Sequence, residues 1–150
     1  MIKLIRTNSD NPDFRALVNL LDKELRVRDG DAHSFYAQYN KIDKIKYVVV
    51  AYLNNIPVGC GAIKEYSKET AEVKRMFVPK EYRGQGIGGI VLKELESWAA
   101  ELNFSDLILE TGKAQPEAIR LYGKSGYTVI ANYGQYEKVD NSVCMKKSIL

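Results

Sequence analysis

The feature that most constrains the fold is a change of hydrophobic period across a glycine-rich loop. Up to Val78, apolar residues alternate with polar ones, which is typical of a half-buried strand. From Ile87, apolar residues recur every three or four positions, as on an amphipathic helix. Between them lie Gly84 and Gly86, which allow a backbone to adopt φ > 0 and to approach a ligand closely. A strand joined in this way to a helix predicts a mixed α/β fold.

The other predicted elements complete a single domain over residues 1–150. Strands are predicted at Ile2–Arg6, Tyr47–Leu53, Pro57–Tyr66, Ala71–Val78, Leu107–Leu109, Tyr127–Ile130 and Ser142–Lys147. Helices are predicted from Pro12, from Ile87 to Leu102, and from Pro116 to Gly126, with a shorter one at Ser34–Tyr39. Asn54-Asn55 favours a tight turn, so the strands between residues 47 and 78 are expected to form an antiparallel meander.

The composition disfavours several classes of protein. A chain of 150 residues can bury roughly 68–70% of its unfolded surface, so it needs no disulfide or metal to fold. Cys60 and Cys144 stand alone, without the paired cysteines or histidines of a zinc site, and we expect no metal. The 22 basic and 19 acidic residues leave a net charge of +3, which does not favour a nucleic-acid partner.

No membrane or targeting segment is expected. Lys3 and Arg6 interrupt the apolar residues at the start of the chain, unlike the core of a signal peptide. No stretch approaches the ~18 apolar residues of a membrane span. We therefore expect a cytoplasmic protein.

The glycine-rich loop, residues 78–89, has the features of a phosphate-binding site. Five basic residues against one acid lie between Lys74 and Lys93, and the amides at the start of the helix favour an anion. The glycines also satisfy the dinucleotide pattern G-x-G-x-x-G, with Glu110 placed to bind a ribose. Five residues separate that pattern from its strand, however, which is untypical of a dinucleotide fold. A P-loop lacks its Gly-Lys-Ser/Thr, and a turn without any ligand stays open.

A third pattern explains more of the chain. The run Arg83-Gly84-Gln85-Gly86-Ile87-Gly88 resembles the Arg/Gln-x-x-Gly-x-Gly/Ala signature of the GNAT N-acetyltransferase superfamily. The segment from Ala118 to Tyr127 matches this family in order and spacing as well, so that the resemblance covers about residues 71–130. It resembles small bacterial members of undefined substrate. The resemblance implies a GNAT fold, with a mixed, mostly antiparallel sheet, splayed central strands and flanking helices.

The resemblance also implies acetyl-coenzyme A (acetyl-CoA) as the cofactor. In the family, the glycine-rich loop holds the pyrophosphate, and the splayed strand pairs with the pantetheine arm. The positions that correspond to cofactor-binding residues are Met76, Phe77, Val78, Arg83, Gly84, Gln85, Gly86, Ile87, Gly88, Gly89, Gln115, Tyr122 and Lys124. Gln115 departs from the asparagine of many relatives, and its longer amide is expected to serve the same arm.

Two residues correspond to the catalytic groups of relatives. Glu72 lies eleven residues before Arg83, the offset of the catalytic glutamate in histone-modifying members, and is a candidate general base acting through water. An acid between Ala71 and Val73 also fits the solvent side of an alternating strand. Tyr122 matches the tyrosine that protonates the leaving sulfur. An aromatic on the apolar stripe of a helix is also typical of a core residue, but the surrounding residues from Ala118 to Tyr127 favour the catalytic role.

The acceptor site is expected between the first helix region and the loop before the last strand. The candidate residues are Arg28, Asp31, His33, Tyr36, Tyr133 and Tyr136. The predicted activity is direct transfer of an acetyl group to a primary amine of a small molecule or peptide. A non-catalytic coenzyme A-binding or sensor module on the same fold is the alternative. The acceptor, the length of the acyl group and the formation of a homodimer stay open.

Overall fold

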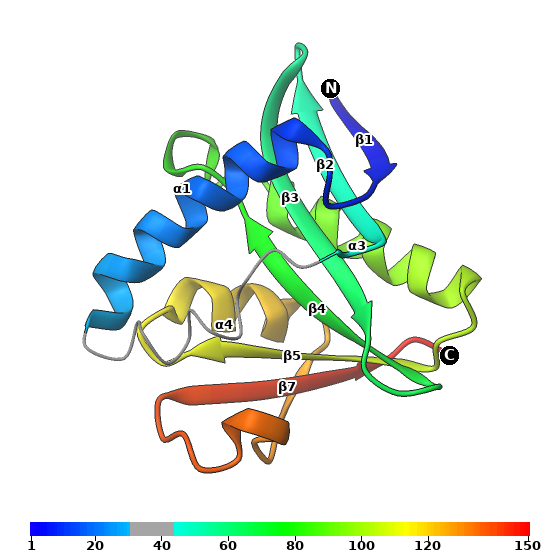
Figure 1. Cartoon of the computed structure of the whole chain (residues 1–150), viewed down its shortest axis with the longest axis vertical. Coiled ribbons are helices and arrows are strands. Elements are labelled where there is room, and N and C mark those ends of the chain that lie inside the picture. The colour runs from blue at the N-terminus through cyan, green and yellow to red at the C-terminus, as the bar shows by residue number, and fades with distance from the viewer. Residues whose placement is uncertain (31–43) are drawn as a thin grey trace.

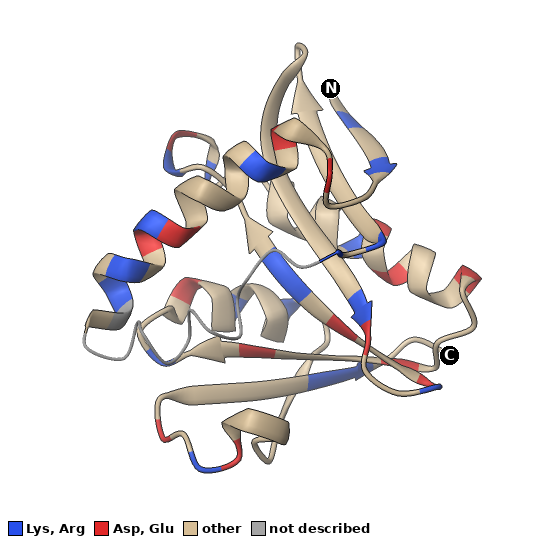
Figure 2. Cartoon of the chain, in the orientation of Figure 1, with Lys and Arg blue, Asp and Glu red and all other residues tan. Residues whose placement is uncertain are grey.

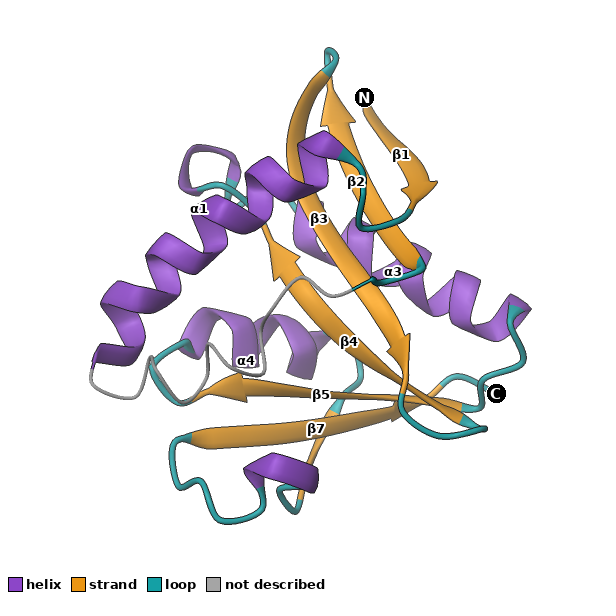
Figure 3. Cartoon of the chain, in the orientation of Figure 1, coloured by secondary structure: helices purple, strands orange, loops and turns teal. Residues whose placement is uncertain are grey.

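The computed structural model describes residues 1–30 and 44–150. Within them, seven strands form one sheet with long helices on both faces (Figures 1 and 3). The strands are β1 (Ile2–Thr7), β2 (Tyr47–Leu53), β3 (Ile56–Glu65), β4 (Thr70–Phe77), β5 (Asp106–Gly112), β6 (Thr128–Ile130) and β7 (Ser142–Ser148). The α-helices are α1 (Pro12–Asp29), α3 (Ile87–Glu101) and α4 (Pro116–Lys124), and short 3-10 turns occur at η2 (Lys80–Tyr82) and η3 (Gly134–Tyr136).

The sheet has the order β1-β2-β3-β4-β5-β7-β6, and one pair in its centre is parallel. All other neighbours are antiparallel. The parallel pair, β4 with β5, is joined only from Thr70 to Glu72 against Asp106 to Ile108. Beyond this point the two strands diverge, as Figure 1 shows. The predicted mixed, mostly antiparallel sheet with splayed central strands is therefore confirmed.

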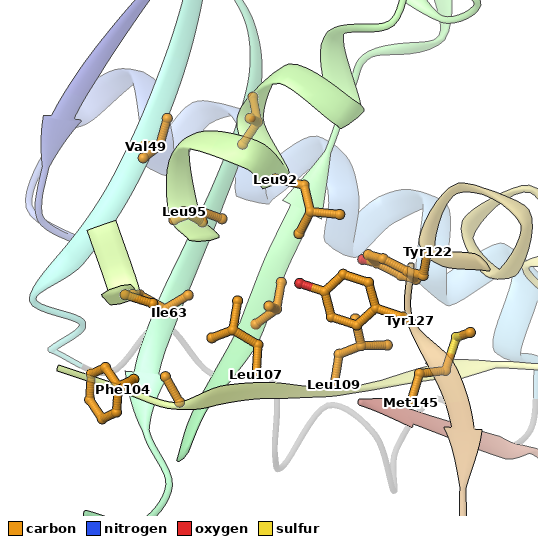
Figure 4. Packing of buried hydrophobic residues seen from close by; sticks show 14 of the residues in the cluster. Val49, Ile63, Leu92, Leu95, Phe104, Leu107, Leu109, Tyr122, Tyr127 and Met145 are labelled. Carbon is orange, nitrogen blue, oxygen red and sulfur yellow. The ribbon is translucent and has the colours of Figure 1, made fainter. Parts of the chain in front are cut away.

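The helices cover the two faces of the sheet with separate apolar clusters. On one face α3 packs against the sheet through Val91, Leu92 and Leu95, and α4 adds Tyr122 to the same cluster (Figure 4). On the other face α1 buries Phe14, Leu17, Val18, Leu21 and Leu25, the helical stripe of its sequence. Each face of the sheet thus carries its own core, and the strands between them are buried on both sides.

The close contact between α3 and β3 depends on a glycine. A Cβ added to Gly61 would lie 2.9 Å from Leu95 Cδ1 and would also overlap the sulfur of Met76. The turn from β2 to β3 places both Asn54 and Asn55 at positive φ, which confirms the tight turn and matches the twist of the hairpin. Gly61 thus lets β3 lie directly against the middle of α3.

The predicted elements agree with the structure apart from their ends. The strand expected at Leu107–Leu109 extends to Gly112, because β7 pairs with it along its whole length even where its residues become polar. Helix α4 ends at Lys124, two residues before the expected Gly126, which adopts φ 98° after the helix. The short helix expected at Ser34–Tyr39 lies outside the described residues. None of the described helices is long and apolar enough to cross a membrane.

Candidate active site

Two cavities lie at the divergence of β4 and β5, and they meet at shared residues. The first, which we call the α1-side cavity, has a volume of about 100 Å³ and is lined by Leu21, Leu25, Glu72, Val73, Lys74, Arg75, Met76, Glu110, Thr111, Gly112, Gln115, Ala118, Tyr122 and Tyr136. The second, the loop-side cavity, has a volume of about 270 Å³ and is lined by Glu24, Met76, Phe77, Val78, Tyr82, Arg83, Gly84, Gly86, Ile87, Gly88, Gly89, Gln115, Glu117, Ala118, Leu121 and Tyr122. Met76, Gln115, Ala118 and Tyr122 line both.

The glycine-rich loop presents open backbone to the loop-side cavity. Gly84 and Gly86 adopt φ 82° and 79°, a conformation that side-chain-bearing residues rarely take. Gly86 precedes α3, and no side chain caps that helix, so its first amides are left for another acceptor. A Cβ added to Gly84, Gly86 or Gly89 would meet nothing within 4 Å. The loop therefore has both the open space and the donors that a phosphate group requires.

The Arg83 side chain is held by other residues of the chain. Its Nε donates to the backbone oxygen of Val78 at 2.8 Å, and its Nη2 donates to both oxygens of Glu24 at 2.8 and 2.9 Å. The guanidinium also lies 5.6 Å from the centre of the Phe77 ring. Arg83 thus links the glycine-rich loop to α1, and direct contact with a phosphate stays a prediction.

Tyr122 lies on α4 at the boundary of the two cavities. Its side chain is buried, and its ring packs edge-on against Tyr127 at a centroid distance of 5.8 Å (Figure 4). Burial, assisted by the charge of Glu110, raises the pKa of Tyr122 above its ordinary value of 10.0. Tyr122 is therefore a protonated phenol at neutral pH, able to donate a proton into either cavity.

Glu72 is the last residue of β4 that pairs with β5, and it lines the α1-side cavity. Its Oε2 accepts a hydrogen bond from the Tyr133 hydroxyl at 2.6 Å, and Lys74 Nζ lies 3.8 Å from its Oε1. Its side chain is 12% exposed. Burial and the negative charge of Glu72 together raise the pKa of Tyr133, so that this tyrosine remains a hydrogen-bond donor. Glu72 is thus a positioned carboxylate and not a solvent-facing strand residue.

A second carboxylate, Glu110 of β5, lines the same cavity. Burial is the largest cause that raises the pKa values of Tyr122 and Tyr136, and the negative charge of Glu110 is the second largest. The glycine pattern indicated Glu110 only as a ribose ligand, so its position in this cavity was not predicted. The available signal was the alternation of β5, in which Leu107 and Leu109 face the α3 core and Glu110 therefore faces α1.

Arg75 is a further cavity residue whose position was not predicted from the sequence. It adopts φ 59° and is only 6% exposed. Its Nη2 lies 3.2 Å from Asp22 Oδ1 of α1, while its buried Nε has no hydrogen-bond partner among the described residues. Burial lowers the pKa of its guanidinium, against the opposing effect of Asp22. No signal in the alternating pattern of β4 distinguishes Arg75 from a surface residue.

The other predicted site residues divide into three groups. Tyr136 lines the α1-side cavity, and Tyr133 donates a hydrogen bond to Glu72, which lines the same cavity. Arg28 pairs with Glu117 of α4 and lines neither cavity, and Gln85 and Lys124 are exposed and also line neither. Asp31, His33 and Tyr36 lie outside the described residues.

Comparison with known proteins agrees with this geometry. The Acetyltransferase (GNAT) family model matches residues 14–127. The chain is 38% identical over 102 residues to the IAA acetyltransferase of Azospirillum brasilense and 32% identical over 112 residues to N-acetyltransferase 14 of Xenopus tropicalis, matches that cover 67% and 74% of this chain. The matched regions span 67% of the Azospirillum brasilense protein and 54% of the Xenopus tropicalis protein, so the chain matches about half the length of the Xenopus relative.

Solved structures show the same fold over the whole chain. A protein of Klebsiella pneumoniae described as an acyl-CoA N-acyltransferase superposes with a TM-score of 0.84 at 28% identity, covering 100% of this chain and 99% of that one. A GNAT acetyltransferase of Elizabethkingia anophelis, solved with acetyl-CoA bound, superposes with a TM-score of 0.70 at 18% identity, covering 98% and 97%. The chain belongs to the GNAT acetyltransferase family. It is an acyltransferase whose cofactor is acetyl-CoA.

Proposed function

We propose that the protein transfers an acetyl group from acetyl-CoA to a primary amine of a small molecule or peptide by direct attack. The observation that carries this proposal is the position of Tyr122, a buried phenol that lines both the loop-side and the α1-side cavity. The loop-side cavity has the open glycine backbone suited to the cofactor. The α1-side cavity has the carboxylates suited to an amine.

The cofactor residues of this proposal line the loop-side cavity. The amides of Ile87, Gly88 and Gly89 would hold the pyrophosphate at the N-terminus of α3, where the helix dipole favours negative charge. The backbone from Met76 to Val78, at the end of β4 and just after it, is left unpaired by β5 and would hold the pantetheine arm, with Gln115 on the opposite side. When bound, acetyl-CoA supplies the activated thioester.

The acceptor amine must lose a proton before it attacks. An amine with a pKa of ~10.4 lies about 3.4 units above pH 7, so its neutral form costs roughly 4.6 kcal/mol. Glu72 is the proposed base, and it would accept this proton through a water molecule. The hydrogen bond from Tyr133 fixes one of its oxygens and leaves Oε1 on the side of Lys74. The second carboxylate, Glu110, adds negative charge that attracts an ammonium group into the cavity.

The leaving sulfur must gain a proton. Tyr122 is the proposed donor because burial keeps its phenol protonated and because it lies where the two cavities meet. Its hydroxyl makes no hydrogen bond with the described residues, so the proton is available for transfer. The chain thus supplies an acceptor of a proton on β4 and a donor on α4.

Release of free thiol from acetyl-CoA, measured against a panel of primary amines, tests the proposal. We expect thiol release that depends on the amine and an acetylated amine in equal amount. Calorimetry with coenzyme A serves as the control for an intact cofactor site. Binding of coenzyme A without release for any amine would instead support the non-catalytic module.

A further inference from the structure

The α1-side cavity contains a buried cationic donor that the proposed reaction does not use. Arg75 is 6% exposed, and its Nε has no hydrogen-bond partner among the described residues. A buried donor without a partner costs free energy, and natural proteins keep few of them. Asp22 engages only Nη2 of the same guanidinium, and Asp22 itself is 40% exposed. Arg75 is therefore a cation held inside the protein with part of its hydrogen-bonding capacity unused.

A bulge in β4 places Arg75 in this cavity. Residues two apart on a regular strand share a face, so Arg75 would follow Val73 into the core beneath α3. The register between β3 and β4 instead shifts between Cys60 and Ala62, and Arg75 adopts φ 59°. This conformation is strained for a residue with a side chain, and such strain is retained chiefly where it serves a site. The bulge turns Arg75 towards α1, where it meets Asp22.

The charges around the cavity are of both signs. Lys74 and Arg75 enter from β4, and Glu72 and Glu110 enter from β4 and β5. Figure 2 shows the basic and acidic segments near one another where these strands diverge. A purely cationic acceptor would suit the two carboxylates but would be repelled by the two cations. An acceptor that carries both an ammonium and a carboxylate complements all four.

We propose that the acceptor is a zwitterionic amine, of the class of free amino acids and their close analogues, whose carboxylate is bound by Arg75. This inference rests on the proposed function, because it assigns the acceptor of that same reaction. The carboxylate pairs with the Arg75 guanidinium where this residue lines the cavity, and the amine lies towards Glu72 and Glu110. Arg75 is then the residue that selects carboxylated acceptors over plain amines.

Matched acceptors test this inference. Free amino acids, their carboxamides and the corresponding decarboxylated amines are compared by thiol release, each at a pH adjusted to give the same fraction of neutral amine. One charge-assisted hydrogen bond corresponds to a preference of about 10- to 100-fold in kcat/KM for the carboxylated member of each set. Equal or better use of the carboxamides would overturn the inference and leave the proposed reaction intact. Thiol release with no amine at all would count against the proposed function itself.

Variants of Arg75 assign the preference to this residue. In Arg75→Gln, the KM for the amino acid should rise about 10- to 100-fold, while the KM values for the carboxamide and for acetyl-CoA stay within twofold. A parallel loss on both acceptors would refute a role in carboxylate binding. Since Arg75→Gln can fail to fold, the wild-type protein provides a second measurement. The 2-hydroxy acid that matches the best amino acid should inhibit competitively, and its amide should not; inhibition by neither overturns the proposal.

Discussion

Replacement of Tyr122 by phenylalanine separates the proposed proton donor from a mere core residue. The change removes one hydroxyl and keeps the ring, whose edge-on contact with Tyr127 fills the space between α4 and β6. The hydroxyl makes no hydrogen bond with the described residues, so we expect the free energy of unfolding to change by less than about 1 kcal/mol. A general acid contributes about 10²- to 10⁴-fold to a rate, which corresponds to roughly 2.7–5.5 kcal/mol in the activation free energy.

Tyr127→Phe is the matched control, because it removes a hydroxyl from the neighbouring ring. The Tyr127 hydroxyl donates to Glu96 Oε2 at 2.9 Å and lines neither cavity. Its loss should destabilise the fold by roughly 1–2 kcal/mol and reduce turnover less than about threefold. Glu96 keeps its ion pair with Lys147 at 3.0 Å, which limits the cost.

The assay is thiol release at saturating acetyl-CoA and acceptor, with thermal melting and coenzyme A calorimetry on the same samples. We expect Tyr122→Phe to lose turnover, to bind coenzyme A as the wild type does, and to melt within a few degrees of it. Turnover above one tenth of the wild-type value, or an equal loss in Tyr122→Phe and Tyr127→Phe, would refute Tyr122 as the proton donor.

Three further predictions follow from the same structure. Glu72→Gln should lower turnover about 10²-fold with an unchanged KM for acetyl-CoA; a loss confined to the cofactor KM would contradict a role as base. Gly86→Ala should weaken coenzyme A binding and lower the free energy of unfolding by about 1–2 kcal/mol, because Gly86 adopts φ 79°. Gly123→Ala should raise the free energy of unfolding by up to about 1 kcal/mol, because Gly123 lies within α4 and an added Cβ would meet nothing within 4 Å. Urea unfolding distinguishes the two variants. Burial and the hydrogen bond to Asp13 raise the pKa of Tyr52 to about 12, so the folded chain keeps protons that the unfolded chain loses above pH 10, and stability should fall as pH rises from 10 towards 12. A urea midpoint that stays constant over that range would contradict this last prediction.

The sequence predicted the order of elements because each carries its own periodic signal. The stripe of α1 and the glycines before α3 are local patterns, and they specify a strand, a loop and a helix without knowledge of the sheet. The same local signals placed Tyr122 and Glu72 on elements that face the cavities. The role of Arg75 could not be predicted, because a bulge depends on the register between β3 and β4 and leaves no mark in the alternation of β4 itself.

The pairing of Arg83 was equally hidden, because its partner is 59 residues away on α1. The motif predicts a guanidinium beside the glycines, and the structure has one there. The sequence around Arg83 nevertheless does not reveal that its Nη2 donates hydrogen bonds to both carboxylate oxygens of Glu24. Contacts of this kind arise from the packing of distant elements, and only the folded chain shows them.

One helix, α1, connects the two cavities through side chains on adjacent stripes of its surface. Leu21 and Leu25, four residues apart, line the α1-side cavity, and Asp22 beside them binds Arg75. Glu24 and Arg28, again four apart, flank these leucines on the side away from Asp22 and bind Arg83 of the glycine-rich loop and Glu117 of α4. Because a helix is rigid over these two turns, α1 ties the Asp22–Arg75 pair to the glycine-rich loop and to α4. The ion pairs that hold α1 therefore fix the α1-side cavity, the proposed acceptor site, relative to the loop-side cavity, the proposed cofactor site, as the proposed direct transfer between two bound molecules requires.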